Sequence, residues 1–154
     1  MKAVVQRVSR ARVTVSGEPV GEIGAGMLVL LGVMRGDGKA QAERLAEKVA
    51  RFRFFTDEDD RMNLSALDLG RAVLVVSQFT LAADGRRGRR PSFDRAAEPA
   101  QAEPLYEHFT GHLRSLGLEC ATGRFGARMS VELENDGPVT FVLEEAPREP
   151  ESPS

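Results

Sequence analysis

Hydrophobic and polar residues alternate along several short stretches of the chain, which is typical of β-strands with one buried face. The pattern predicts strands at Lys2–Val8, Ala11–Val15, Val20–Ile23, Leu118–Ala121 and Arg128–Glu134. Two further stretches, Met27–Val33 and Ala72–Ser77, are almost entirely apolar. Because continuous apolar runs of this length favour strands covered on both faces, we expect these two to lie in the centre of a sheet.

Two longer stretches repeat their apolar residues with the helical spacing i, i+3, i+4, i+7. They predict one helix at Lys39–Arg53 and a second at Gln101–Leu116, with Gly117 placed to end it. We therefore expect an α/β fold with mixed β layers and the two main helices packed on one side, a β/β/α-type arrangement. At 154 residues, the chain has the length of a single compact domain.

Composition limits the possible functions more than it changes the fold. The formal net charge is −2, so any contact with nucleic acid must be local. Cys120 is the only cysteine, which excludes an internal disulfide and a cysteine-rich metal site. The start of the chain lacks the apolar core of a signal peptide, and no apolar run approaches a membrane span, so we expect a soluble cytoplasmic protein. Residues 146–154 are rich in Pro, Glu and Ser and predict a disordered tail after a domain at 1–145.

The segment Asn135–Thr140 separates two runs with strand character, Arg128–Glu134 and Phe141–Glu144. Asp-Gly between such runs favours a tight turn that joins two strands of a hairpin. Pro138 complicates this interpretation, because proline has no N–H group to donate to a strand ladder. A glycine followed by a proline, whose peptide bond can be cis, can also hold two carbonyl oxygens in an unusual direction. The segment alone favours the plain turn and leaves the second interpretation open.

Small polar residues follow the second apolar run, in the sequence Ser77-Gln78-Phe79-Thr80. Ligands of sheet proteins often bind where strands end. Hydroxyl, amide and exposed N–H groups at this point could position an ester or stabilise an oxyanion. An ordinary polar strand end explains the same residues equally well.

Four arginines, Arg86, Arg87, Arg89 and Arg90, lie within five positions of a glycine-rich stretch that predicts a long loop. Arginine guanidinium groups match the oxygens of phosphates, and each such contact adds salt-sensitive affinity. A solvated loop that aids solubility is the alternative. Because the rest of the chain is slightly acidic, we favour local binding of a polyanion.

Other chemically suggestive residues have simpler explanations. His108 and His112 have the spacing of two metal ligands on a helix, but the intervening glutamate of the zinc-binding HExxH pattern and a third ligand are missing. Cys120 lies in a predicted strand and is expected to be a small buried residue. The acidic run Asp57–Asp60 lacks the spacing of a calcium loop and predicts a solvated turn.

Together, these segments resemble the D-aminoacyl-tRNA deacylase family. The resemblance depends mainly on Ser77-Gln78-Phe79-Thr80-Leu81 and on Asn135-Asp136-Gly137-Pro138-Val139-Thr140. It is supported by Val5–Val8, Arg61–Ser65, Arg90–Phe93 and Gly123–Met129, which follow in the family's order and extend it to about residue 145. This chain departs from the family at Ala82, where an aromatic residue is common, and in its loop, where arginines replace a common lysine.

The resemblance implies an enzyme that hydrolyses the ester between a D-amino acid and the 3′-terminal adenosine of tRNA, and that also removes glycine from mischarged tRNA. It implies no metal and no organic cofactor. It also implies a homodimer whose active sites lie at the subunit interface.

The resemblance also implies a role for particular residues. Gly137 and Pro138, joined by a cis bond, would project carbonyl oxygens into the partner's pocket and reject L side chains, and Arg7 would help to hold them. The pocket itself would be lined by Ser77, Gln78, Phe79 and Thr80. Phe125 and Met129 would pack on the terminal adenine, while the four loop arginines would bind tRNA.

Two mechanisms and two other functions remain open at this point. Thr80 could act as a nucleophile, although the sequence offers no base to activate it. We favour a mechanism in which the protein positions the ester and the ribose 2′-hydroxyl of tRNA assists the attack of water. The alternative functions are a non-catalytic tRNA-binding module and a general hydrolase of small esters, against which the absence of a plausible catalytic triad counts.

Overall fold

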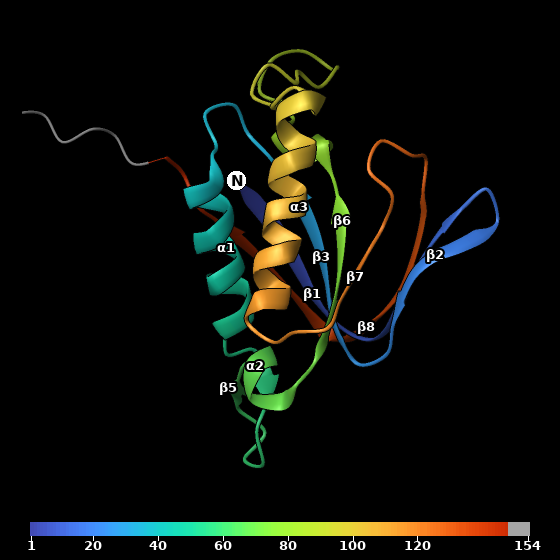
Figure 1. Cartoon of the computed structure of the whole chain (residues 1–154), viewed down its shortest axis with the longest axis vertical. Coiled ribbons are helices and arrows are strands. Elements are labelled where there is room, and N and C mark those ends of the chain that lie inside the picture. The colour runs from blue at the N-terminus through green and yellow to red at the C-terminus, as the bar shows by residue number, and fades with distance from the viewer. Residues whose placement is uncertain (148–154) are drawn as a thin grey trace, which may run out of the picture.

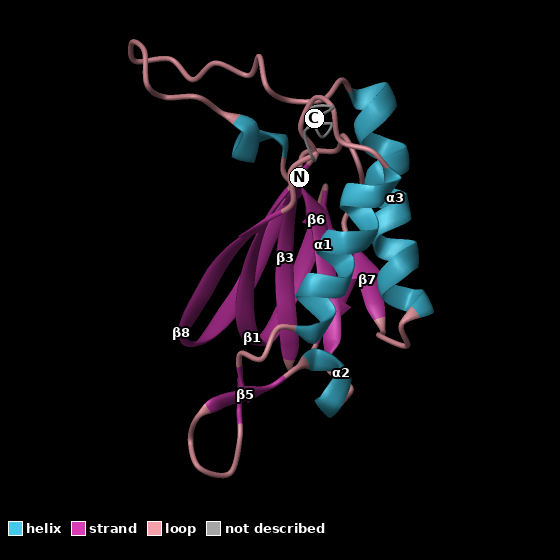
Figure 2. Ribbon diagram, turned by 90° about the vertical axis from the view of Figure 1, so that its left-hand side faces the viewer, coloured by secondary structure: helices cyan, strands magenta, loops and turns pink. Residues whose placement is uncertain are grey.

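A six-stranded mixed sheet with two long helices on one face makes up most of the computed structural model, which describes residues 1–147 (Figures 1 and 2). The strands of this sheet are β1 (Lys2–Val15), β2 (Glu18–Ile23), β3 (Gly26–Gly32), β6 (Ala72–Ser77), β7 (Cys120–Thr122) and β8 (Ser130–Glu144). The helices are α1 (Lys39–Arg51), the short α2 (Ala66–Leu69) and α3 (Pro99–Ser115), and the remaining elements are the hairpin strands β4 (Phe55–Thr56) and β5 (Met62–Leu64) and a 3₁₀ turn, η1 (Phe79–Ala82).

The long strand β1 organises the sheet. One of its edges pairs antiparallel with β8, from Lys2 opposite Glu144 to Thr14 opposite Ser130. Its other edge pairs with β3 in the first half and with β2 in the second half, so β1 belongs to two parts of the sheet. Beyond β3, the strands β6 and β7 are added in parallel, which places the end of β6 beside the end of β3.

Two apolar clusters cover the two faces of the sheet. The larger one lies between the sheet and the helices and includes Val29, Leu45 and Phe109. The smaller one, which includes Val13 and Leu74, lies on the opposite face, where β2 and the far half of β1 curl over β3 and β6. The predicted mixed β layers with both main helices on one side are therefore confirmed.

Several predicted boundaries change. The two strands predicted at Lys2–Val8 and Ala11–Val15 form the single strand β1, because β8 pairs with it along its whole length. The helix α3 begins at Pro99 rather than Gln101, since proline is well suited to a first turn whose N–H groups need no partner. Within the described residues, no helix is both long and apolar enough to cross a membrane. Most of the predicted disordered tail, residues 148–154, lies outside the described part of the chain.

The predicted hairpin at Asn135–Thr140 is wrong. Both flanking runs pair with β1 instead of with each other, so they form one strand, β8. Asn135 lies opposite Val8 and Thr140 lies opposite Gln6, so the four residues between them, 136–139, face Arg7 alone. The Asp-Gly-Pro residues that suggested a hairpin turn form a bulge instead, because β1 is the pairing partner of both flanking runs.

Candidate active site

The chain turns sharply at the end of β6, where the polar segment Ser77–Thr80 lies. The Gln78 amide donates to the Leu31 carbonyl oxygen at 2.7 Å, and the Leu81 amide donates back to the Gln78 carbonyl at 3.2 Å. A Cβ atom on Gly32 would lie 2.9 Å from Leu81 Cβ and 3.2 Å from the Gln78 carbonyl oxygen. Glycine at position 32 therefore allows η1 to fold back over the end of β3.

This turn leaves polar groups available for a ligand. The amides of Phe79 and Thr80 open a 3₁₀ turn, and the first N–H groups of a helical turn have no acceptor within it. The Phe79 side chain is 58% exposed. In the described part of the chain, the Thr80 hydroxyl has one side-chain partner, the Gln78 amide nitrogen, which donates to it. The turn thus offers donors to a ligand. Among residues 1–147, neither a carboxylate nor an imidazole hydrogen-bonds to Thr80 to activate it as a nucleophile.

A groove of about 600 Å³ opens beside the turn. Ser77, Gln78 and Phe79 form one wall, and Phe125 and Met129, which precede β8, form another. The remaining lining is mostly apolar and comes from the loop after β3, the end of β6, the loop before α3, the first turn of α3 and the segment that leads into β8 and begins it. It consists of Val33, Arg35, Val76, Phe93, Ala96, Ala97, Glu98, Pro99, Ala102, Gly126, Ala127 and Val131. A groove with apolar walls and a few polar groups at one end suits a ligand with a flat ring and a polar reacting centre.

The wall made by Phe125 and Met129 is fixed from behind. The Phe125 ring lies 6.1 Å from the buried ring of Tyr106, and the Tyr106 hydroxyl donates to the Val75 carbonyl oxygen at 2.6 Å. Burial raises the pKa of Tyr106 well above its usual value, so the hydroxyl remains a donor at all physiological pH values. This hydrogen bond connects α3, β6 and the wall of the groove.

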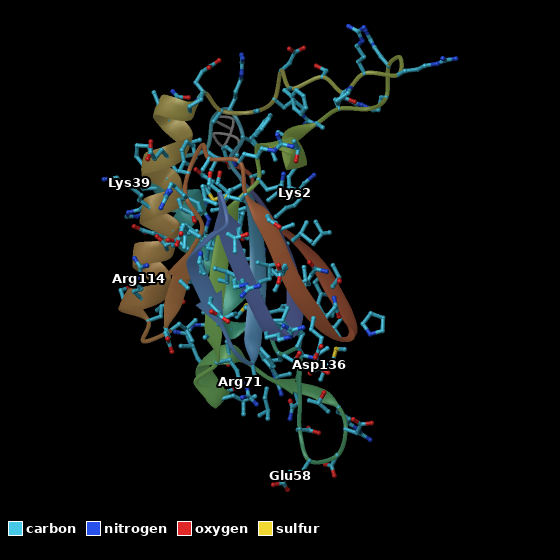
Figure 3. The ribbon with its side chains drawn as sticks, turned by 90° about the vertical axis from the view of Figure 1, so that its right-hand side faces the viewer. Lys2, Lys39, Glu58, Arg71, Arg114 and Asp136 are labelled. Carbon is cyan, nitrogen blue, oxygen red and sulfur yellow. The ribbon has the colours of Figure 1, made fainter. Side chains whose placement is uncertain are left out.

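The arginine-rich segment forms an arm that projects from the same end of the sheet (Figures 2 and 3). Asp84 and Ser92 close the arm by exchanging two backbone hydrogen bonds of 2.7 and 2.9 Å. The Asp84 carboxylate accepts from the Arg86 guanidinium and backbone amide, and the guanidinium holds the pKa of Asp84 far below its usual value. Arg86 is therefore engaged within the arm, whereas the side chains of Arg87, Arg89 and Arg90 are exposed to solvent.

The bulge in β8 is closed by the side chain of Asn135. Its Oδ1 atom accepts from the Val139 amide at 2.8 Å, and its Nδ2 atom donates to the Thr140 hydroxyl at 3.2 Å. The Gly137–Pro138 peptide bond is cis. A Cβ atom on Gly137 would lie 2.5 Å from the Val139 nitrogen, so only glycine fits there.

Arg7, the residue opposite the bulge, contacts it directly. Its Nε atom donates to the Asp136 carbonyl oxygen at 2.9 Å. Its Nη1 atom donates to the Phe54 carbonyl oxygen at 3.1 Å and to the Thr56 hydroxyl at 3.0 Å. The Arg7 side chain is only 13% exposed, so the guanidinium connects the bulge to the hairpin β4–β5 from a sheltered position.

The bulge and the groove are separate within one chain. The bulge lies three strands away from β6 and about four residues further along β1, a separation of roughly 20 Å. In Figure 3, Asp136 lies towards the end that carries Glu58, whereas Lys2 lies towards the other end. The structure therefore gathers Ser77, Gln78, Phe79, Phe125 and Met129 around one groove, with Thr80 on the adjoining turn. It places Arg7, Gly137 and Pro138 elsewhere.

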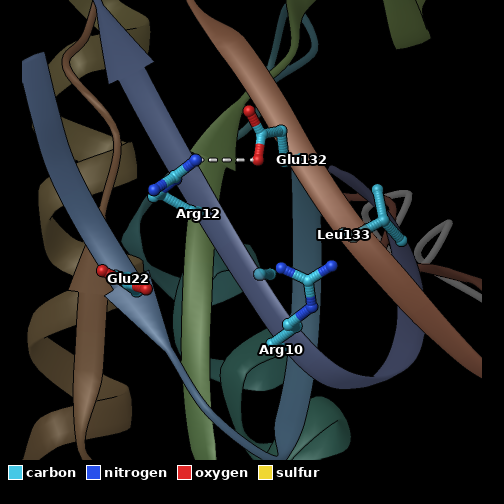
Figure 4. Close-up of a pocket in the computed structure, with 6 residues that line it drawn as sticks. Arg10, Arg12, Glu22, Glu132 and Leu133 are labelled. Atoms are coloured by element: carbon cyan, nitrogen blue, oxygen red, sulfur yellow. Dashed lines mark hydrogen bonds and ion pairs between the residues drawn. The ribbon is translucent and has the colours of Figure 1, made fainter.

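The other candidate residues lie outside this groove. His108 and His112 hydrogen-bond to Glu43 and Glu47 of α1, and within residues 1–147 no three potential ligands gather to hold a metal ion. Burial raises the pKa of the Cys120 thiol to about 11. A second, shallow hollow of about 70 Å³ lies over the far half of β1, where Arg12 pairs with Glu132 at 3.0 Å (Figure 4). It is too small for more than a few water molecules.

Some residues of the groove were missed by sequence reasoning. Phe93 packs 5.2 Å from Phe79, ring centre to ring centre, at the rim of the groove. Arg35 lines the groove from the turn after β3, and its guanidinium lies 3.7 Å from the Glu98 carboxylate. The sequence contained one signal for Phe93, its place in the supporting segment Arg90–Phe93, but none for Arg35.

Comparisons with known proteins agree with this architecture. The family model described as D-Tyr-tRNA(Tyr) deacylase matches residues 4–144. A D-aminoacyl-tRNA deacylase of Symbiobacterium thermophilum is 63% identical over 144 residues, which cover 94% of this chain and 95% of the relative. Another, of Roseiflexus sp., is 60% identical over 146 residues, covering 95% of this chain and 94% of the relative.

Solved structures give the same result for the fold. A structure described as c-Myc DNA Unwinding Element Binding Protein has a TM-score of 0.89 at 42% identity, covering 96% of this chain and all of that one. A structure described as a probable eukaryotic D-amino acid tRNA deacylase has a TM-score of 0.81 at 17% identity, covering 94% and 98% of the two chains, and is similar in fold. Because the family model matches residues 4–144 and a relative that is 63% identical covers 94% of the chain, the chain belongs to the D-Tyr-tRNA(Tyr) deacylase family.

Proposed function

We propose that the protein hydrolyses the ester that links a D-amino acid to the 3′-terminal adenosine of tRNA, and that it also removes glycine from mischarged tRNA. The observation that carries the proposal is the groove, which combines a donor-rich turn at Ser77–Thr80 with an apolar wall at Phe125 and Met129. The turn suits the aminoacyl ester, and the wall suits a purine ring. The full-length similarity to D-aminoacyl-tRNA deacylases supports the same conclusion.

The protein positions the ester and leaves bond breaking to water. The 2′-hydroxyl of the terminal ribose assists the attack of water on the ester carbonyl, and the amides of Phe79 and Thr80 stabilise the developing oxyanion. Water adds to the carbonyl carbon, and the tetrahedral oxyanion then collapses as the bond to the ribose 3′-oxygen breaks. One proton of the water passes to that oxygen, and the other leaves with the released carboxylic acid. The contacts of Thr80 support this choice, since its hydroxyl contacts the Gln78 amide, which is not a base. No metal or organic cofactor takes part.

Gly137 and Pro138 act as the filter that rejects L-aminoacyl-tRNA. A carbonyl oxygen placed where an L side chain must go excludes it by steric clash and by desolvation, whereas a D side chain points elsewhere and glycine has none. The hydrogen bonds from Arg7 and within the bulge support this role, because a filter that rejects by clash must hold its position. Arg7 thus contributes to substrate selection through the bulge.

The active enzyme is a homodimer in which each subunit inserts its bulge into the groove of its partner. The separation of roughly 20 Å between bulge and groove supports this arrangement, because one chain cannot bring the two together without unpairing the sheet. The exposed arginines Arg87, Arg89 and Arg90, with Arg86 ordering the arm, hold the tRNA beside the groove. Residues 1–145 act as one catalytic domain in the cytoplasm, and we assign no role to the tail.

Release of amino acid from matched D-tyrosyl-tRNA and L-tyrosyl-tRNA tests the proposal. We expect rapid release from the D form and little from the L form, and slow release from simple esters that lack tRNA. Salt-sensitive binding of tRNA without any release would instead favour a non-catalytic tRNA-binding module. Equal rates with the two forms would contradict the filter, and equal rates with simple esters would indicate a general esterase.

A further inference from the structure

Arg7 connects the hairpin β4–β5 to the bulge of β8, although about eighty residues separate these two segments in the sequence. We infer that this hairpin holds the bulge in place through Arg7, and that Thr56 is a positioning residue for the discrimination between D- and L-aminoacyl-tRNA. The inference rests on the proposed function, because it names a residue that supports the filter. It concerns residues of the hairpin, which lines neither the groove nor the bulge.

A polar connection links the hairpin to the bulge. One edge of the Arg7 guanidinium donates to the Asp136 carbonyl oxygen, and Nη1 donates to both the Phe54 carbonyl oxygen and the Thr56 hydroxyl. A planar guanidinium fixed at two edges cannot rotate without breaking one set of contacts. The position of the Asp136 carbonyl, which immediately precedes Gly137, is therefore set in part by Thr56.

An aromatic connection runs beside the polar one. Phe54 is buried, and its ring centre lies 5.9 Å from that of Phe141, which follows the bulge in β8. Phe52 packs edge-on against Phe141 at 5.0 Å. These contacts attach the base of the hairpin to β8 on the far side of the bulge. The hairpin is thus fixed to the same strand whose bulge it supports.

The hairpin is also ordered within itself. The Asp57 carboxylate accepts from the amides of Asp59 and Arg61 at 2.9 and 3.0 Å, which closes its tip. Arg53 donates to the Asn63 carbonyl oxygen at 2.8 Å across its base. A support with its own hydrogen bonds can hold a neighbouring segment, whereas a mobile loop could not.

The consequence is a separation of rate and selectivity. Thr56 contacts Arg7 and not the groove, so removing its hydroxyl should leave the hydrolysis of D-tyrosyl-tRNA almost unchanged. The bulge would lose one of the contacts that fix it and would exclude L side chains less strictly. A lost hydrogen bond to a charged group corresponds to about a tenfold fall in the ratio of kcat/KM for the D form over the L form.

The experiment measures this ratio for full-length wild type and three variants. Thr56→Val removes the hydroxyl but keeps the shape and the strand preference of the side chain. Thr56→Ser restores an acceptor for Arg7. Thr14→Val is the matched control, because it makes the same change in β1 at the end of the ladder, opposite Ser130. Amide exchange of Val139, whose N–H closes the bulge, is measured in parallel.

The inference requires the ratio to fall about tenfold in Thr56→Val only. It also requires faster Val139 exchange and an unchanged kcat for the D form in that variant, and recovery of the ratio in Thr56→Ser. A wild-type ratio and wild-type exchange in Thr56→Val would overturn it and leave the proposed function intact. An equal loss of D and L activity, or loss of the fold, would make Thr56 a structural residue and also overturn it. If wild type itself did not prefer the D form, the proposed function would fail first.

Discussion

The turn after β6 and the bulge in β8 are both short irregular segments at the edges of regular strands, but they are held in different ways. The turn is held by backbone hydrogen bonds and by the close approach that Gly32 permits, and its Phe79 side chain is exposed. The bulge is held by side chains, since Asn135 closes it and Arg7 anchors it from the opposite strand. A segment that positions a substrate through its backbone groups needs few side-chain contacts. A segment that rejects a substrate by steric clash must be held rigidly, because a flexible segment would move aside.

The largest effect expected from this difference is that of Arg7→Ala on selectivity. The variant removes the three hydrogen bonds by which Arg7 joins the bulge to the hairpin and to Phe54 at its base. Hydrogen bonds to a charged group are worth about 1.5–3 kcal/mol each. We expect the D-over-L ratio of kcat/KM to fall roughly 100-fold, with a much smaller change in the D rate. The rates of tyrosine release from D-tyrosyl-tRNA and L-tyrosyl-tRNA measure this ratio.

Arg12→Ala is the matched control for that variant. Arg12 lies on the same strand and pairs with Glu132, but both side chains are exposed, so the pair contributes little. The control should keep the wild-type ratio. A wild-type ratio in Arg7→Ala would mean that the bulge holds its position without Arg7, and the contrast between the two segments would lose its basis.

A second prediction separates the arm's own order from its contact with tRNA. Replacing Arg87, Arg89 and Arg90 together with alanine should raise KM for aminoacyl-tRNA more than tenfold. It should also reduce the slope of log KM against log salt concentration by about 2, since each of three lost phosphate contacts contributes roughly 0.7. Titrating KM against salt measures this slope. Arg86→Ala should change this slope by less than the loss of one phosphate contact would, because Arg86 is already paired with Asp84. An equal effect of Arg86→Ala would show that this pair opens to bind phosphate.

The sequence predicted the sheet and both long helices because their apolar spacing repeats over many residues. It failed at Asn135–Thr140 because turn chemistry shows where a chain bends, not which strand the flanking runs will pair with. The pairing was set by β1, more than a hundred residues earlier. Contacts such as Arg7 with Thr56 carry no local signal at all, since the two residues meet only after β1 and the hairpin have packed together.

The sequence predicted several residues of the groove, but not that they would come together. Ser77 to Thr80 stood out because polar residues follow an apolar strand. Phe125 and Met129 became candidates only through resemblance to a family, because neither residue type is unusual after a loop. Their meeting with the turn depends on Tyr106, which fastens α3 to β6 and supports Phe125. Such packing is decided by the tertiary structure.

Met129→Ala tests the wall of the groove, and we expect a smaller effect than for the arm. Met129 lines the groove and packs over Gly123, where its sulfur approaches within 2.7 Å of the position of a Cβ atom. Loss of a surface for the adenine should raise KM about tenfold and change kcat little. Met62→Ala, at an exposed methionine of β5, is the control. A fall in kcat without a rise in KM would place Met129 near the reacting ester rather than the base.

The smallest effect is expected for Thr80→Ala, and it decides the mechanism. If Thr80 only accepts a hydrogen bond from Gln78, its loss should lower kcat about fivefold, the value of one neutral hydrogen bond. If Thr80 forms a covalent intermediate, removing it should lower kcat by a factor of about 10⁴ or more. The two outcomes differ so widely that single-turnover release from D-tyrosyl-tRNA separates them.

Binding must be measured with the same variant, because a lower rate has two possible origins. Thr80→Ser keeps a hydroxyl and serves as the control for the shape of the turn. If Thr80→Ala bound D-tyrosyl-tRNA normally but released no tyrosine, Thr80 would be the nucleophile, and the turn would carry out the chemistry itself. Retention of most of the activity would leave water and the tRNA's own 2′-hydroxyl as the reacting groups. The turn would then act through its backbone, and side chains would matter most at the bulge.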